Sequence, residues 1–114
     1  MTGTTIDVEI NGTSGLLHVH GDVTAASDSA FGDAYTEATA VGARSLVLDF
    51  SDMAYMNSGG IGVLVTMLVR CQRGGQRLLA TGLDAHYRQI LTLTRLDEAI
   101  AVHDSEAAAL ASIA

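Results

Sequence analysis

The stretch Y-M-N-S-G-G-I-G-V, residues 55–63, places three glycines at the start of an apolar helical pattern. Each glycine in a helix interior costs about 0.5–1 kcal/mol relative to alanine, so Gly59, Gly60 and Gly62 require a physical reason. Either the backbone packs tightly against a neighbouring segment, or it is left bare so that a partner can approach. The spacing by itself leaves both interpretations open.

The residues on both sides of this stretch predict a buried strand followed by a helix. Ser45–Phe50 is a short apolar run bounded by turn signals, which is typical of a central strand. A loop is expected at Ser51–Met56. From residue 61 to residue 68 apolar side chains recur with helical spacing, which predicts a helix from near Ser58 to Gln72 that ends at Gly74-Gly75.

The N-terminal residues predict a β-hairpin. Residues 6–10 alternate between apolar and polar, and Asn11-Gly12 is a turn signal. The second strand of the hairpin is expected at Leu16–His20. Its alternation gives two faces, with Leu17 and Val19 on one and Leu16, His18 and His20 on the other.

The rest of the chain alternates helices with strands. Helical spacing extends from about Thr24 to Val41, where Gly42 is a suitable stop. Beyond the central strand and helix, the pattern predicts a strand at Gln76–Thr81, a helix at Asp84–Leu93, a strand at Ala99–Val102, and a last helix that ends at Ile113 and is capped by Asp104 or Ser105.

Together these elements predict an α/β fold with a single domain over residues 1–114. An N-terminal β-hairpin is expected to join a mostly parallel, mixed sheet of about five strands, covered by about four helices, because strand–helix–strand units need right-handed crossovers. A length of 114 residues fits one domain with a real core.

The composition narrows the range of functions. A net charge of −7 argues against binding to nucleic acid or to anionic lipid, since both need a basic surface. No apolar run is long enough to span a membrane and no secretion signal is recognisable, so we expect no membrane insertion and a cytoplasmic location. The lone cysteine, Cys71, lies in an apolar helical stretch, which predicts a buried, inert thiol.

A helix that begins near Ser58 would present unpaired amide N–H groups and a partial positive charge at its first turn. Either Asn57 or Ser58 is the expected N-cap, because both side chains can accept an amide hydrogen bond. With Gly59 and Gly60 in the first turn, the Ser58 hydroxyl would be open as part of a docking surface. A phosphate on Ser58 would add about −1.5 to −2 charges there, and its own helix would tolerate them.

The stretch L-V-L-D-F-S-D-M-A-Y-M-N-S-G-G-I-G-V-L-V, residues 46–65, resembles the signature of the STAS domain, specifically that of the bacterial anti-sigma factor antagonists. That signature has an aspartate, a phosphorylatable serine, a serine, threonine or glycine, and then glycine, an aliphatic residue and glycine. Residues 20–27, H-G-D-V-T-A-A-S, resemble the family's early glycine-acidic segment, and residues 93–100, L-T-R-L-D-E-A-I, resemble a later one. The resemblance covers nearly the whole chain.

By this resemblance Ser58 occupies the phosphoacceptor position. Gly60 and Gly62 match the motif glycines, and Gly21 and Asp22 match the early glycine and acidic residue. The partner-binding residues that the resemblance implies are Asn57, Ser58, Gly59, Gly60, Gly62, Gly21, Asp22 and Thr24.

Two positions differ from the family pattern. Asn57 and Thr24 each stand where the family usually has aspartate, so both differences remove a carboxylate from the neighbourhood of Ser58. A kinase would meet less negative charge at this site. The fold is not affected, because Asn caps a helix as well as Asp does.

The resemblance implies a function as an anti-sigma factor antagonist. With Ser58 unmodified, the domain would bind an anti-sigma factor that is also a serine kinase, and so release a sigma factor. Phosphorylation of Ser58 would break this complex, and a phosphatase would restore it. The alternative is a STAS scaffold that is not phosphorylated, as a subunit of a lipid-transport or stressosome-like assembly, in which Asn57 reflects the loss of the modification.

Histidines suggest a further candidate site. His18 and His20, together with His86 or His103, could ligate a metal. Alternating histidines on a strand more often form a polar or partner-facing surface, so we expect no metal site and no cofactor.

Signals for catalysis are weak. Asp49 and Asp52 could act as acid and base, yet no histidine or lysine is next to them in the sequence, so solvated or capping roles are expected. Residues 57–62, N-S-G-G-I-G, lack the lysine and the full spacing of a phosphate-binding loop. Since no nucleophile, base and orienting group can be assembled from these spacings, we expect no catalytic residues and no enzymatic activity.

Overall fold

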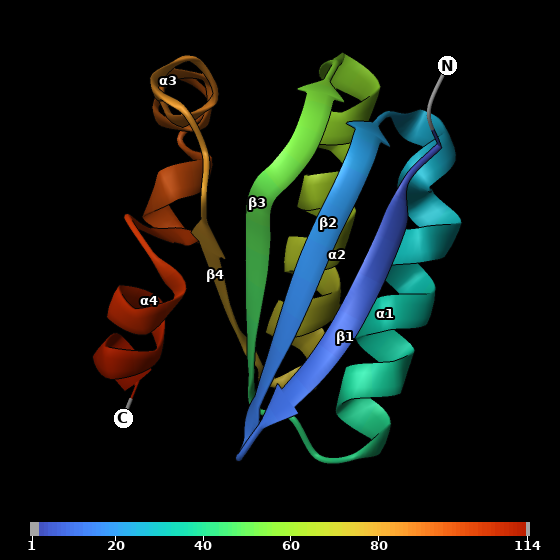
Figure 1. Ribbon diagram of the computed structural model, residues 1–114, viewed down its shortest axis with the longest axis vertical. Helices are drawn as coiled ribbons and strands as arrows, with labels where there is room; N and C mark the ends of the chain where they lie inside the picture. Colours follow the sequence, from blue (N-terminus) through green and yellow to red (C-terminus); the bar gives the residue numbers. More distant parts are fainter. Residues whose placement is uncertain (1–2, 114) are drawn as a thin grey trace.

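A five-stranded mixed sheet forms the centre of the computed structural model, which describes residues 3–113 (Figure 1). The strands lie in the order β1-β2-β3-β4-β5, with β1 antiparallel to β2 and every other neighbouring pair parallel. Their bounds are β1 (Thr5–Asn11), β2 (Ser14–Val23), β3 (Ser45–Met56), β4 (Arg77–Thr81) and β5 (Ala101–His103). The predicted hairpin and mostly parallel sheet are confirmed.

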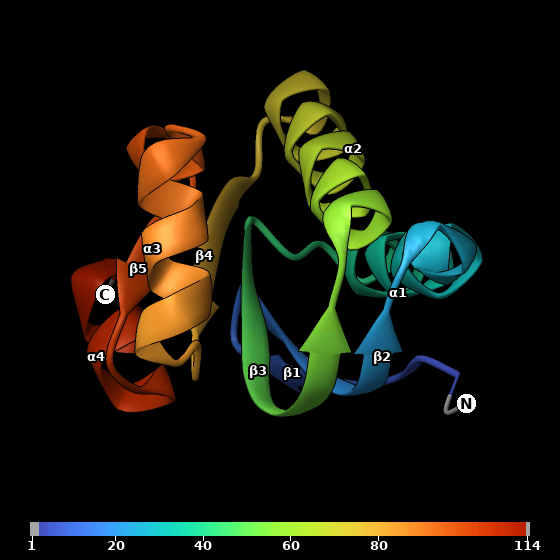
Figure 2. The ribbon, with the colours of Figure 1, turned by 90° about the horizontal axis from the view of Figure 1, so that it is seen from above.

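Helices cover the sheet unequally. Those of the described chain are α1 (Asp28–Ala40), α2 (Ser58–Gly74), α3 (Ala85–Leu93) and α4 (Glu106–Ile113), with short 3-10 turns η1 (Ala25–Ser27) and η2 (Leu96–Glu98). Seen from above, α1 and α2 lie on one face of the sheet and α4 on the other (Figure 2). No helix is drawn in front of β1 and β2, so this part of the second face is open (Figure 1).

Two hydrophobic cores follow from the alternation of side chains along the strands. The larger core lies under α1 and α2 and includes Leu17, Val19, Phe31, Leu48, Leu64 and Leu91. The smaller core lies under α4 and is formed by Leu16, Val47, Leu79 and Ala109. Adjacent residues of β2 therefore enter different cores, as the predicted two-faced pattern of this strand requires.

The loop predicted at Ser51–Met56 is wrong, because these residues form the second half of β3. They pair with an extension of β2, which reaches Val23 rather than His20, in a register that places Val23 opposite Met56. The segment resembles a loop in the sequence because both of its faces are largely exposed: Ser51, Asp52, Ala54 and Tyr55 all face solvent, so no apolar alternation marks it as a strand. Hydrogen bonding to β2 is what keeps it extended.

Glycines end several elements as predicted. Gly75 follows α2 with a φ of 78°, in the left-handed conformation that closes a helix.

Within residues 3–113, none of the helices combines the length and the apolar character that crossing a bilayer requires.

Candidate functional site

Asn57, rather than Ser58, is the N-cap of α2. Its backbone is extended, with a φ of −109°, and its Oδ1 accepts a hydrogen bond from the Gly60 N–H at 3.0 Å. Its carbonyl also accepts from the Ile61 N–H at 3.1 Å. Ser58 is consequently the first residue of the helix, and it is exposed to solvent. The hydroxyl proposed from the sequence as a phosphoacceptor is thus accessible.

The glycines of this turn have two different roles. A Cβ on Gly60 would lie 2.3 Å from the carbonyl oxygen of Val23, and one on Gly59 would lie 2.8 Å from the nitrogen of Ala25. Tight internal packing therefore explains both, and the expected bare surface at these positions is corrected. Gly62 is exposed, and a Cβ there would meet nothing within 4 Å. Open surface in this turn comes from Ser58 and Gly62.

The early segment of the motif, residues 20–27, lies beside this turn. It contains the last residues of β2, and β2 ends next to the end of β3, where Val23 pairs with Met56. The Val23 carbonyl accepts a hydrogen bond from the Asn57 N–H at 3.2 Å. Thr24 caps η1, since its Oγ1 accepts from the Ala26 N–H at 3.2 Å. Gly21 has a φ of 86°, and Asp22 is half-buried. Backbone contacts through Val23, rather than a carboxylate, join the two motif segments.

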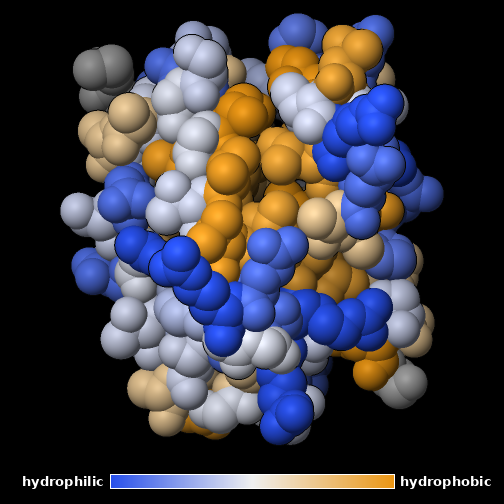
Figure 3. Space-filling view, turned by 180° about the vertical axis from the view of Figure 1, so that it is seen from behind, coloured by the Kyte–Doolittle hydropathy of each residue, from blue (hydrophilic) through white to orange (hydrophobic). Residues whose placement is uncertain are grey.

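An apolar hollow of about 330 Å³ adjoins Ser58, lined by Met56, Asn57, Ser58, Ile61, Ile90 and Thr94. The Met56 N–H donates to the Tyr87 hydroxyl at 3.1 Å, which fixes α3 beside the end of β3. None of the lining side chains is charged. Viewed from the face that carries α1 and α2, a continuous hydrophobic area occupies the middle of the surface (Figure 3). Exposed Val65 and Leu93 add apolar surface on α2 and at the end of α3.

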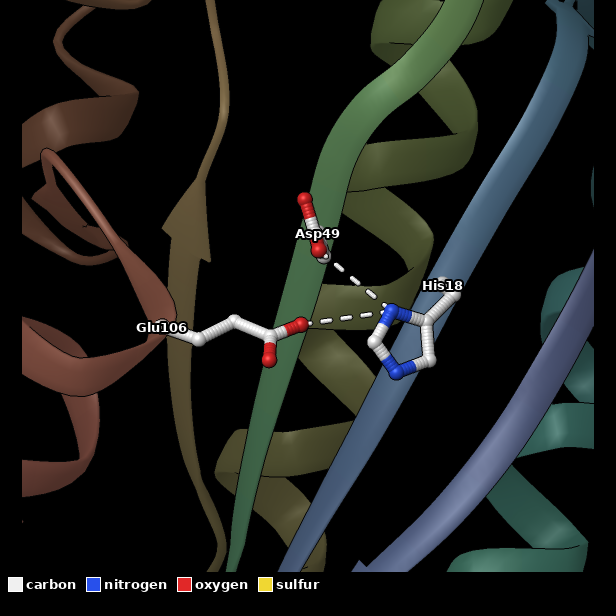
Figure 4. A group of neighbouring side chains, drawn as sticks. All are labelled: His18, Asp49 and Glu106. Atoms are coloured by element: carbon white, nitrogen blue, oxygen red, sulfur yellow. Dashed lines mark hydrogen bonds and ion pairs between the residues drawn. The ribbon is translucent and has the colours of Figure 1, made fainter.

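A second group of polar side chains, on the open face of the sheet, was missed by sequence reasoning. His18 Nδ1 lies 3.3 Å from Asp49 Oδ2 and 3.2 Å from Glu106 Oε2 (Figure 4). We call these three residues, His18, Asp49 and Glu106, the His18 group. Asp49 has no histidine near it in the sequence, but His18 lies beside it in space. The solvated or capping role expected for Asp49 therefore leaves out this contact.

The register of β2 and β3 produces this arrangement. Asp49 pairs with His18 and Asp52 pairs with His20, so β3 contains one more residue than β2 between the two pairs. This bulge places both aspartates on the face of the histidines, although an odd spacing would otherwise put them on opposite faces. The sequence signal that could have revealed the group is the combination of His18 and His20 with Asp49 and Asp52 on neighbouring strands.

The sequence offered His18 and His20, with His86 or His103, as a metal site that was not expected, and these histidines do not converge in the described residues. His18 and His20 each contact separate carboxylates, and the residues whose ligand atoms converge within 4.8 Å in the described chain are those of the His18 group. His86 lies on α3 and His103 ends β5.

The carboxylates of the His18 group affect each other's pKa in opposite directions. Burial tends to raise the pKa of Asp49, but hydrogen bonds with Glu106, Ser51 and His18 together hold it below its ordinary value. The pKa of Glu106 is raised by hydrogen bonding to Asp49, by burial and by repulsion from the Asp49 charge. Any proton retained by the pair therefore resides on Glu106.

Cys71 is buried inside α2, as predicted. Burial raises the pKa of its thiol to about 11. The thiolate is therefore scarce at neutral pH, and the residue packs as a small apolar side chain.

A family model described as "Mlab, STAS domain" matches residues 6–103 of the chain. Several solved structures share the fold. An anti-sigma factor antagonist from Mycobacterium paratuberculosis superposes with a TM-score of 0.80 at 20% identity, covering 96% of this chain and 93% of that one. The anti-sigma factor antagonist SpoIIAA in its unphosphorylated form gives a TM-score of 0.73 at 13% identity, with coverages of 96% and 97%.

SpoIIAA of Bacillus has also been solved in a phosphorylated form, which matches with a TM-score of 0.69 at 11% identity, covering 96% of this chain and 100% of that chain. A sulfate transporter family protein from Wolinella succinogenes matches with a TM-score of 0.77 at 16% identity, covering 91% of this chain and 87% of that one. The same fold thus occurs in regulators and in a transporter family.

Proposed function

This chain belongs to the STAS domain family, and from that premise we propose that it is an anti-sigma factor antagonist controlled by phosphorylation of Ser58. In its unmodified form it binds an anti-sigma factor that is also a serine kinase, and a sigma factor is released. Phosphorylation ends the binding, and a phosphatase reverses the modification. The protein acts in the cytoplasm by binding rather than by catalysis.

The observation that carries the proposal is the position of Ser58. Its side chain is exposed at the first position of α2, next to an apolar hollow whose lining has no charged side chain. The hydroxyl is accessible to a kinase, while the apolar surface beside it suits a protein partner. Ser58 is therefore placed where a kinase can modify it and where a bound protein partner would cover it.

Electrostatics explain how a phosphate would prevent binding. The modification adds about −1.5 to −2 charges, which the N-terminus of α2 tolerates because of its partial positive charge. A partner that covered Ser58 would have to bury these charges against neutral groups such as Ile61 and Ile90. Burying an uncompensated charge costs several kcal/mol, and about 1.4 kcal/mol is a tenfold loss of affinity.

A second candidate is a STAS scaffold that binds its partner permanently in a transport or stressosome-like assembly. Two features favour it: Asn57 and Thr24 replace the aspartates usual in phosphorylated antagonists, and a sulfate transporter family protein has the same fold. The docking surface would be the same hollow, but Ser58 would not be modified.

Affinity capture with paired variants distinguishes the two candidates. The chain carrying Ser58→Ala or Ser58→Asp is used as bait in a lysate of the source organism, and the bound proteins are identified by mass spectrometry. We expect a protein with a serine-kinase domain on the Ala bait and not on the Asp bait. Equal recovery of a transport subunit on both baits would contradict the switch and support the scaffold.

A further inference from the structure

The His18 group lies on the open face of the sheet, away from the helices α1 and α2 that cover the other face (Figures 1 and 4). We propose that His18, Asp49 and Glu106 form a binding site for a divalent transition-metal ion of the zinc type. The site joins β2 and β3 to the first turn of α4, so the bound ion would fasten the C-terminal helix to the sheet.

The distances match the spacing of metal ligands. Bonds from zinc to nitrogen or oxygen are about 2.0–2.2 Å long, which places neighbouring ligand atoms about 3–3.5 Å apart in tetrahedral or octahedral geometry. His18 Nδ1 lies 3.3 Å from Asp49 Oδ2 and 3.2 Å from Glu106 Oε2. One nitrogen and two oxygen ligands suit zinc and its neighbours better than magnesium, which prefers oxygen ligands and water.

The His18 group contains two carboxylates and a single imidazole, so its negative charges are not balanced within the group. Without a metal, His18 Nδ1 carries the proton that it shares with the two carboxylates, while Nε2 faces Glu9 Oε1 at 3.7 Å. A cation bound at Nδ1 would displace that proton and leave the ring proton on Nε2, toward Glu9. Glu106 Oε2 is shielded from solvent and has no hydrogen-bond partner of good geometry among residues 3–113. A divalent cation would accept all three lone pairs at once.

The two carboxylate ligands are positioned by hydrogen bonds in their own elements. Asp49 Oδ1 accepts hydrogen bonds from the Ser51 N–H at 3.0 Å and the Ser51 hydroxyl at 2.6 Å, so Oδ2 is turned toward His18. Glu106 begins α4, where Ser105 Oγ accepts from the Ala108 N–H at 3.1 Å. The side chains are 27%, 15% and 31% exposed for His18, Asp49 and Glu106, which leaves an entry path for an ion and room for water ligands.

His20 provides a matched control on the same face. It also contacts two carboxylates, but Asp7 Oδ2 lies 3.0 Å from Nε2 and Asp52 Oδ2 lies 3.5 Å from Nδ1. Because the two carboxylates sit at different ring nitrogens, they do not converge with one nitrogen on a single ion. The chemistry around His20 is similar to that of the His18 group, and the geometry is different.

The test is calorimetric titration of the untagged, chelator-treated full chain with zinc chloride, together with thermal unfolding in zinc and in magnesium. We expect one zinc ion per chain and a higher melting temperature with zinc but not with magnesium. His18→Asn and Glu106→Gln should each weaken zinc binding at least tenfold, whereas His20→Asn should leave it unchanged.

Three results would overturn the proposal. They are an absence of zinc binding by the wild-type chain, an equal response to magnesium, and an equal loss of affinity in His20→Asn and His18→Asn. The first would mean that the group is an ion-pair cluster only, and the others would indicate non-specific attraction to an acidic surface. Circular dichroism of each metal-free variant verifies that a lost affinity is not a lost fold.

Discussion

The turn that begins α2 and the His18 group lie on opposite faces of the sheet and differ most in charge. Ser58 sits beside a hollow lined by neutral side chains, whereas His18 is in contact with the carboxylates of Glu9, Asp49 and Glu106. A new charge at the neutral site meets only the partial positive charge of the helix N-terminus and no charged side chain in the hollow that a partner would cover. In the His18 group, the positions of the charges already present determine which ligand can bind. The first therefore suits a switch for a protein partner and the second a small cation.

The largest effect is expected from a charge placed at the neutral site. Ser58→Asp should weaken binding to the captured kinase at least a hundredfold, while Ser58→Ala should leave the affinity within about threefold, because only Asp adds a charge that the partner must bury. Isothermal titration with the purified kinase measures both.

Stability serves as the control for this pair. Asp at the first position of a helix interacts favourably with the helix dipole, so Ser58→Asp should not lower the free energy of unfolding. Equal affinities of the two variants would remove the electrostatic switch from the account and leave the permanent scaffold.

The next largest effect concerns packing at the same turn. Gly60→Ala should lower the free energy of unfolding by about 1–3 kcal/mol, since its Cβ would lie 2.3 Å from the Val23 carbonyl oxygen. Gly62→Ala is the matched control and should raise it by about 0.5–1 kcal/mol, because its Cβ meets nothing within 4 Å and Ala favours the helix. Urea unfolding of both variants is the measurement. Similar changes for the two would show that helix propensity, rather than close approach to β2, governs this turn.

A smaller effect is expected at the cap. Asn57→Ala removes the acceptor of the 3.0 Å hydrogen bond from the Gly60 N–H and should cost about 1 kcal/mol of unfolding free energy. Asn57→Asp keeps an acceptor and should be close to neutral. Chemical denaturation distinguishes them, and a cost for Asp as large as that for Ala would mean that the cap bond is not what stabilises the start of α2.

The smallest effect is expected at His20, in the charged region but outside the His18 group. His20→Asn removes the largely exposed contacts of the imidazole with Asp7 and Asp52, so the unfolding free energy should change by less than about 0.5 kcal/mol. Thermal unfolding at low and high salt measures this change. A loss of several kcal/mol would show that the open face depends on ion pairs for its stability.

The two regions also differ in how far the sequence predicts them. The Ser58 turn is contiguous, so helical spacing and the glycines identify it, although the choice between Asn57 and Ser58 as the cap had to come from the structure. The direction in which Gly59 and Gly60 face could not be predicted, because it depends on the approach of α2 to the end of β2.

The His18 group could not be predicted in the same way, because its three residues come from β2, β3 and α4. Asp49 pairs with His18 just before the bulge, next to the segment that was predicted to be a loop, Ser51–Met56. Alternation of apolar and polar residues does not indicate which strand will be the neighbour, so the pairing that completes β3 became visible only in three dimensions.

The most direct test of the central claim is the intact mass of the chain after incubation with ATP and the kinase that it captures, followed by peptide mapping. The account predicts one added phosphoryl group, located on Ser58, absent in Ser58→Ala and accompanied by loss of kinase binding. An unchanged mass of the wild-type chain, or the same addition to Ser58→Ala, would contradict it.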